Sequence, residues 1–97
     1  MLETVALCYV LLDVGGVFLS LLPEPQRNEI HAEIGFDPWE DKVYDVMTNA
    51  LSITSGGDAD ATWVALLEAE RKYFEMMPED IVVSTKACAS VYFFYAD

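Results

Sequence analysis

The sequence predicts an all-α fold, a compact bundle of about five helices that forms a single domain over residues 1–97. Three observations support this prediction. Apolar residues recur at steps of three and four over most of the chain. Proline or aspartate precedes several of these apolar segments, and glycine or proline ends them. A length of 97 residues, of which 54% are apolar, is sufficient for one core.

The N-terminal segment, residues 2–22, is apolar around most of a helical circumference and is predicted to be the central helix. Its main stripe has helical spacing and consists of Leu2, Val5, Tyr9, Leu12, Gly16 and Leu19. The alternative is a β-hairpin with its turn at Asp-Val-Gly-Gly. Gly15 and Gly16 support it, because each glycine destabilises a helix by up to about 1 kcal/mol. We expect a helix whose glycines permit a close crossing by another helix.

The same segment approaches the length of a membrane-spanning helix, which needs about 20 residues. Glu3 and Asp13 interrupt it, and the first basic residue of the chain is Arg27. We therefore expect a buried core segment and no association with a membrane.

A short helix is predicted between Pro25, which suits a first helical turn, and Gly35, which suits a C-terminal cap. The next predicted helix starts with Asp37 as N-cap, has Pro38 in its first turn and Glu40 as capping-box partner, and continues to about residue 53. Its predicted apolar face consists of Trp39, Val43, Val46, Met47, Ala50 and Leu51.

A further helix is predicted to begin at Asp58 or Asp60 and to stop at Pro78. Large apolar side chains recur on it with helical spacing, so we expect this face to be buried. The residues of the face are Trp63, Leu66, Leu67, Glu70 and Phe74.

The last segment, residues 79–95, has the composition of a helix or of strands. Ile81, Cys88 and Tyr92 fit one helical face, whereas Ile-Val-Val-Ser-Thr and Val-Tyr-Phe-Phe-Tyr are rich in strand-forming residues. We favour the helix. The alternative is an α+β fold in which the N- and C-terminal segments pair as strands around the three central helices.

Four consecutive aromatic residues, Tyr92, Phe93, Phe94 and Tyr95, stand near the end of the chain. On a helix they cannot all face one core. Exposed members of this set could form a homodimer or a partner contact, whereas a segment buried on two sides would cover them all.

Cys8 and Cys88 lie near opposite ends of the sequence. The apolar start carries Glu3 instead of the basic residues of a secretory leader. We expect two buried free thiols in a reducing compartment, and hence a cytoplasmic protein, with a disulfide as the alternative.

The charge of the chain limits its function. Seventeen carboxylates and five Lys or Arg side chains give a net charge of -12, which repels nucleic acid and anionic membranes and attracts basic partners. The prediction is a small non-enzymatic binding protein that inhibits a basic, nucleic-acid-handling complex by occupying its cationic site. Its size and charge are similar to those of phage-encoded inhibitors of CRISPR or restriction complexes, which would place it in the host cytoplasm. An immunity protein or antitoxin that neutralises a basic toxin is the alternative.

The candidate partner-binding residues are carboxylates at helical spacing. Asp37, Asp41 and Asp45 recur at steps of four, which would place them about 6 Å apart along one helix face. A row of this kind could imitate successive phosphates in a nucleic-acid groove. The full predicted set is Asp37, Glu40, Asp41, Asp45, Glu29 and Glu33. The competing interpretation is an ordinary solvated helix face.

Catalytic and metal-binding patterns are lacking in the sequence. His31 is the only histidine, so neither a zinc site nor a Cys–His pair has support. Asp58 and Asp60 begin like a calcium loop, but Trp63 and Ala69 occupy the positions that require glycine and glutamate. We therefore expect no catalytic residue, cofactor or metal. A small enzyme and an assembly subunit joined by the aromatic tail are the remaining function classes.

Overall fold

The computed structural model describes residues 1–96 and confirms the predicted all-α bundle. Five helices make up 82% of the structure, and residues 1–96 contain no strand, so the α+β alternative is wrong. Both segments with strand-like composition are helical. The helical segments are α1 (Leu2–Val10), the π-helical turn η1 (Leu11–Gly15), α2 (Gly16–Ser20), α3 (Glu24–Ile34), α4 (Asp41–Thr54), α5 (Ala59–Glu75) and α6 (Pro78–Tyr95).

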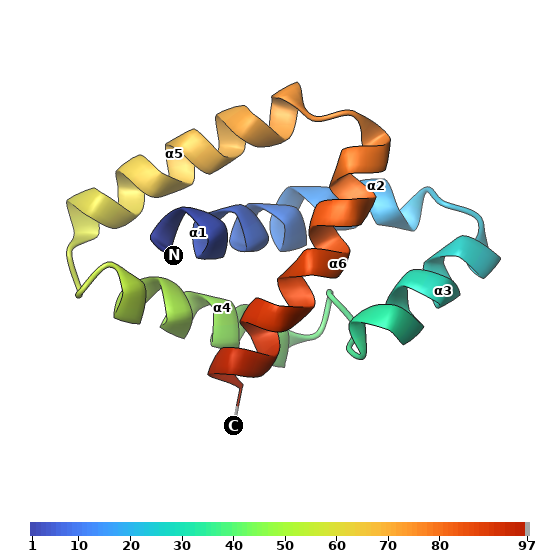
Figure 1. Cartoon of the computed structure of the whole chain (residues 1–97), viewed down its shortest axis with the longest axis horizontal. Helices are drawn as coiled ribbons and strands as arrows, with labels where there is room; N and C mark the ends of the chain where they lie inside the picture. Colours follow the sequence, from blue (N-terminus) through green and yellow to red (C-terminus); the bar gives the residue numbers. More distant parts are fainter. Residues whose placement is uncertain (97) are drawn as a thin grey trace.

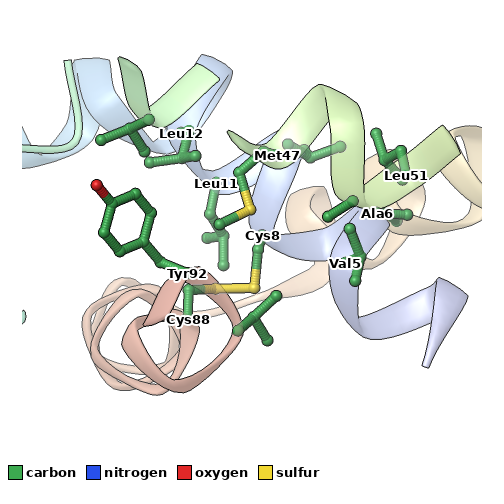
Figure 2. Packing of buried hydrophobic residues seen from close by; sticks show 14 of the residues in the cluster. Val5, Ala6, Cys8, Leu11, Leu12, Met47, Leu51, Cys88 and Tyr92 are labelled. Carbon is green, nitrogen blue, oxygen red and sulfur yellow. A yellow bond between two sulfur atoms is a disulfide. The ribbon is translucent and has the colours of Figure 1, made fainter. Parts of the chain in front are cut away.

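The first three segments, α1, η1 and α2, form one continuous helix at the centre of the molecule (Figure 1). This helix packs against α4, α5 and α6. Figure 2 shows side chains of α1, α4 and α6 meeting in the core. The prediction of a central helix is confirmed. The buried residues of this helix include Val5, Ala6, Cys8, Val10, Leu11, Leu12 and Leu19.

Residues Leu2–Ser20 are also long and apolar enough to cross a membrane, with a mean hydropathy of 1.8. Half of the segment is buried within the fold. The core helix of a soluble protein and a signal sequence near an N-terminus can both have this length and hydropathy, so length and composition alone are weak evidence for a membrane span.

The helix ends are in part those that the sequence predicts. Gly35 closes α3 in the left-handed conformation, with a φ of 83°. The carboxylate of Asp58 caps α5 by accepting hydrogen bonds from the backbone N–H groups of Asp60 and Ala61. These two ends confirm the predicted punctuation.

The start of α4 lies three residues after the predicted one. The helix begins at Asp41, not after Asp37, and its N-cap, Glu40, makes no side-chain capping bond. The carboxylate of Asp37 instead accepts a hydrogen bond from the N–H of Trp39 at 3.0 Å, which holds residues 37–40 in a turn. The apolar face of α4 is close to the prediction, with Val43, Met47, Ala50 and Leu51 buried.

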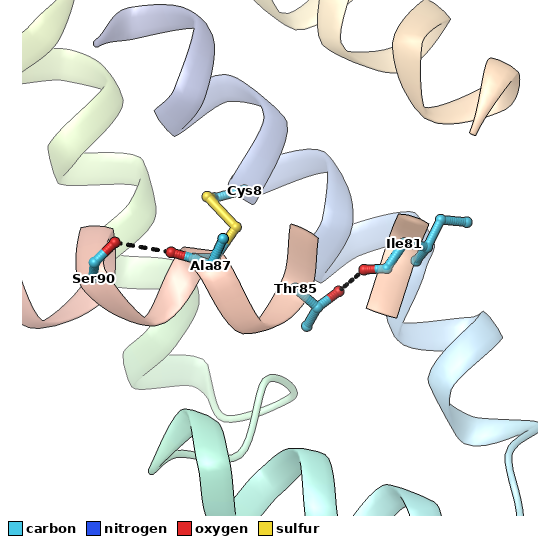
Figure 3. The surroundings of a disulfide bond; sticks show 6 residues. Cys8, Ile81, Thr85, Ala87 and Ser90 are labelled. Atoms are coloured by element: carbon cyan, nitrogen blue, oxygen red, sulfur yellow. Dashed lines mark hydrogen bonds between the residues drawn. A yellow bond between two sulfur atoms is a disulfide. The ribbon is translucent and has the colours of Figure 1, made fainter. Parts of the chain in front are cut away.

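The two cysteines form a disulfide, so the prediction of free thiols is wrong. Cys8 of α1 and Cys88 of α6 have their Cα atoms 5.6 Å apart although 80 residues separate them in the sequence (Figures 2 and 3). The crossing of the first and last helices brings them together, and the sequence contains no local sign of that crossing. The expectation of a cytoplasmic location rested on free thiols and loses this support, because stable disulfides are rare in reducing compartments.

The buried face of α5 is not the predicted one. Ala65, Ala69 and Tyr73 are buried, whereas Trp63 and Phe74 are 63% and 70% exposed. Small side chains at the contact permit close approach of two helices, and α5 lies along α1 at these alanines. The large apolar residues consequently point away from the core.

The aromatic tail on α6 is divided between core and surface. Tyr92 is buried and packs against Phe36 with a ring-centroid distance of 4.2 Å. Phe93 and Phe94 are exposed, and Tyr95 is half-buried. Dimer formation through this tail stays a prediction.

Candidate functional site

The acidic side chains lie on the surface of the molecule. Every Asp and Glu among residues 1–96 is exposed. Some are paired with cations: Glu3 with the N-terminal amine, Glu33 with Lys86, and Glu68 and Glu75 with Arg71. Because the chain has only five Lys and Arg residues, most of the negative charge is uncompensated.

The six predicted partner-binding carboxylates do not form one row. Asp37 and Glu40 lie in the turn before α4, so the predicted stripe of three aspartates on one helix is wrong. Asp41 and Asp45 remain, one turn apart and exposed on α4. The physical reason is the turn at residues 37–40, in which Pro38 is buried and Trp39 is half-buried.

Glu29 and Glu33 belong to α3, which packs against α6. They therefore lie on a different helix from Asp41 and Asp45. Glu33 accepts a hydrogen bond from the Lys86 ammonium group at 2.8 Å, which raises the pKa of Lys86. This ion pair reduces the charge that α3 can offer to a partner. The two pairs of carboxylates are therefore separate features of the surface.

The carboxylates of α4 continue along the helix into a groove. Asp41, Asp45, Thr48 and Ser52 follow one another at steps of four, three and four, which places them on one stripe of α4. Thr48 and Ser52 line the groove itself. A partner that enters the groove would therefore meet these aspartates along the same face.

This groove, called the Trp63 groove below, consists of two adjoining hollows of about 400 and 180 Å³ that share Tyr9, Trp63 and Leu66. The helix α1 contacts both α4 and α5 and forms the floor, while α4 and α5 form the walls. The larger hollow is lined by Tyr9, Thr48, Leu51, Ser52, Ser55, Gly57, Ala59, Thr62, Trp63 and Leu66. The smaller hollow is lined by Tyr9, Val10, Asp13, Val14, Trp63, Leu66, Leu67 and Glu70.

One end of the Trp63 groove is acidic. Asp13 of η1 and Glu70 of α5 line the smaller hollow, and both are exposed. None of the described residues that line either hollow is Lys or Arg. The groove therefore combines an apolar surface with unpaired negative charge.

Asp13 lies in the π-helical turn η1. Next to Asp13, the carbonyl of Leu12 accepts a hydrogen bond from the Tyr44 hydroxyl at 2.6 Å, and the ring of Tyr44 meets that of Tyr9 edge to face. Burial raises the pKa of Tyr44, and the negative charge of Asp13 and the nearby Tyr9 raise it further. Single π turns inside α-helices are frequent at functional sites.

The apolar part of this site was not predicted from the sequence. Trp63 and Leu67 belong to the face that we expected to be buried, and Asp13 was regarded only as an interruption of an apolar segment. The pair of small residues Ala65 and Ala69, four positions apart, could have indicated which face of α5 is buried, because small side chains at this spacing permit a close helix contact. Choosing between an alanine face and a tryptophan face requires knowledge of what packs on α5.

His31 is half-buried, with its ring 5.4 Å from that of Trp39. Among residues 1–96, no three His, Cys, Asp or Glu side chains are grouped as a metal ion would require. Comparison of the chain with protein-family models, with curated proteins and with solved structures finds no match.

Proposed function

We propose that this protein is a non-enzymatic acidic binding protein that occupies a cationic surface of a basic protein partner. The observation that carries the proposal is the placement of charge: every described carboxylate is exposed, on a chain with a net charge of -12. Mutual repulsion of these groups is unfavourable in the free protein. A cationic partner relieves that repulsion, so binding is favoured electrostatically.

The charge would act mainly on the rate of association. A field of one sign attracts an oppositely charged partner over distances of about 10 Å at moderate salt, and this attraction weakens as ionic strength rises. Asp41 and Asp45 are the carboxylates that we expect to contact the partner, because both are exposed and continue the stripe that lines the Trp63 groove.

The specific form of the proposal is inhibition of a nucleic-acid-handling protein. Such a partner has a cationic site built for phosphates, and exposed carboxylates can occupy it in place of nucleic acid. Phage-encoded inhibitors of CRISPR or restriction complexes are proteins of this kind. With two aspartates on α4 instead of three, imitation of a phosphate row is limited to a short stretch of one helix.

Affinity capture followed by competition tests this proposal. The tagged chain, with its disulfide intact, is used to isolate partners at low salt, and each partner is identified by mass spectrometry. We expect a basic protein that leaves the chain as salt is raised. For a nucleic-acid-handling partner, the chain should displace a DNA duplex from it while showing no affinity for the duplex itself. Neutral or acidic partners that bind independently of salt would overturn the proposal.

A further inference from the structure

Two large apolar side chains of the Trp63 groove are exposed to solvent. Trp63 is 63% exposed and Leu67 is 49% exposed, and both line the smaller hollow. Tryptophan is among the residues that most often anchor protein interfaces. An exposed Trp beside a hollow can therefore contribute binding free energy once a partner covers it.

The dimensions of the groove suit a short helix. Along α5 the lining residues run from Ala59 to Glu70, a distance of about 16 Å at the usual rise per residue. About three turns of an α-helix have this length. The groove also has the arrangement that helix recognition uses, with two helices as walls and a third as floor.

The charge of the groove selects the occupant. Asp13 and Glu70 lie at one end, Asp45 and Asp41 extend the α4 wall, and the described lining contains no basic residue. A second copy of this chain would bring a further charge of -12 to the same surface, and an anionic membrane would also be repelled. A basic segment has the complementary charge.

We propose that the Trp63 groove binds an amphipathic helix of a basic protein. The apolar face of that helix would cover Trp63, Leu66 and Tyr9, and its Lys or Arg side chains would approach Asp13 and Glu70. The inference rests on the proposed function and deepens it, because it specifies the segment of the partner that is bound. Apolar anchoring would supply most of the affinity, and the carboxylates would set orientation and association rate.

A pair of synthetic peptides tests the groove directly. Both have about 15 residues of Leu, Ala and Lys in identical composition. One places Leu at positions i, i+3, i+4 and i+7 of a helix, and the other has the same residues in scrambled order. We expect the amphipathic peptide to bind with chemical-shift changes confined to residues around the Trp63 groove, and the scrambled peptide to bind at least about tenfold more weakly.

Three variants separate the contributions. Trp63→Ala should weaken peptide binding about tenfold or more, the range for an interface anchor. Phe94→Ala, which removes another exposed aromatic residue on α6, should leave the affinity unchanged. The double change Asp13→Asn and Glu70→Gln should weaken binding less and reduce its dependence on salt. Because Trp63 is mostly exposed, retention of the fold by Trp63→Ala can be verified by circular dichroism.

Several results would overturn the inference. Equal binding of both peptides would show that charge alone is recognised, and unchanged binding by Trp63→Ala would show that the groove is not used. Self-association of the wild type that Trp63→Ala abolishes would identify a second copy as the occupant. Binding to phosphatidylcholine vesicles that Trp63→Ala abolishes would identify lipid. If these peptide tests fail while a captured basic partner still responds to changes at Asp41 and Asp45, the proposed function stands and the groove inference falls.

Discussion

Trp39, in the turn before α4, packs directly on the backbone of Gly16 in the central helix. A Cβ atom at Gly16 would overlap the indole nitrogen of Trp39. The glycine that the sequence analysis assigned to a close helix crossing therefore accommodates a tryptophan side chain. The neighbouring Gly15 differs, because a Cβ there would lie 3.6 Å from the ring of Tyr73, an ordinary contact distance.

Because of this difference, alanine substitutions at Gly16 and Gly15 should have different effects on the free energy of unfolding. Gly16→Ala should destabilise the fold by about 1–3 kcal/mol, the usual cost of overpacking. Gly15→Ala should be neutral or stabilising by up to about 1 kcal/mol, because alanine restricts the unfolded chain and favours the helix. Urea unfolding of both variants measures the two changes. A loss of stability in Gly15→Ala equal to that in Gly16→Ala would show that Trp39 is not the cause.

The disulfide should contribute substantially to stability. Replacement of Cys8 and Cys88 by Ala should lower the free energy of unfolding by about 2–4 kcal/mol, because the bond closes a loop of about 80 residues in the unfolded chain. Thermal melting of this variant, compared with wild type with and without reductant, measures the effect. A non-reduced wild type that melts with the double variant would contradict the pairing, as would an intact mass that shows two free thiols.

The orientation of α5 predicts which of its positions tolerate substitution. Ala69, which is 5% exposed, should not accept a larger side chain, and Ala69→Leu should cost about 1–3 kcal/mol. Trp63→Ala should change stability by less than about 1 kcal/mol, because the side chain is mostly exposed. Chemical denaturation compares the two. A greater loss in Trp63→Ala than in Ala69→Leu would show that α5 presents its other face to the core.

Tyr44 should stabilise the π-helical turn. Tyr44→Phe removes the hydrogen bond to the Leu12 carbonyl and should cost about 1–2 kcal/mol at neutral pH. The raised pKa of Tyr44 in the folded protein has a further consequence. The unfolded chain releases this proton first, at its ordinary pKa of about 10, so folding stability falls as pH rises above that value. The fall should be smaller in Tyr44→Phe, and stability measured between neutral and alkaline pH checks this. An identical pH dependence in both proteins would contradict it.

Much of the fold could be predicted because helix signals are local. Gly35 and Asp58 act as caps through their own backbone or side chain, and the spacing of Val43, Met47 and Leu51 marks a buried face without reference to other elements. The choice between helix and strand at both ends of the chain also followed from periodicity. These features depend on residues within a few positions of one another.

The errors concern contacts between distant segments. The helix predicted to follow Asp37 starts three residues later than expected, after a turn in which Trp39 packs against Gly16, more than 20 residues earlier in the sequence. The pairing of Cys8 with Cys88 and the inward face of α5 also depend on which helices cross. The candidate site was consequently predicted in part: Asp41 and Asp45 are exposed on one helix, but the groove beside them is formed by three helices and could not be inferred from any one of them.

We propose that exposed carboxylates bring this protein to a basic partner. The most direct measurement is the dissociation constant for the captured partner at low and moderate salt, determined for wild type, for Asp41→Asn with Asp45→Asn, and for a control of equal charge, Glu24→Gln with Glu79→Gln, on α3 and α6. We expect affinity to fall with salt in the wild type, and the α4 variant to bind more weakly than the control at low salt, with a smaller dependence on salt. Equal affinities for all three proteins, unchanged by salt, would contradict the claim.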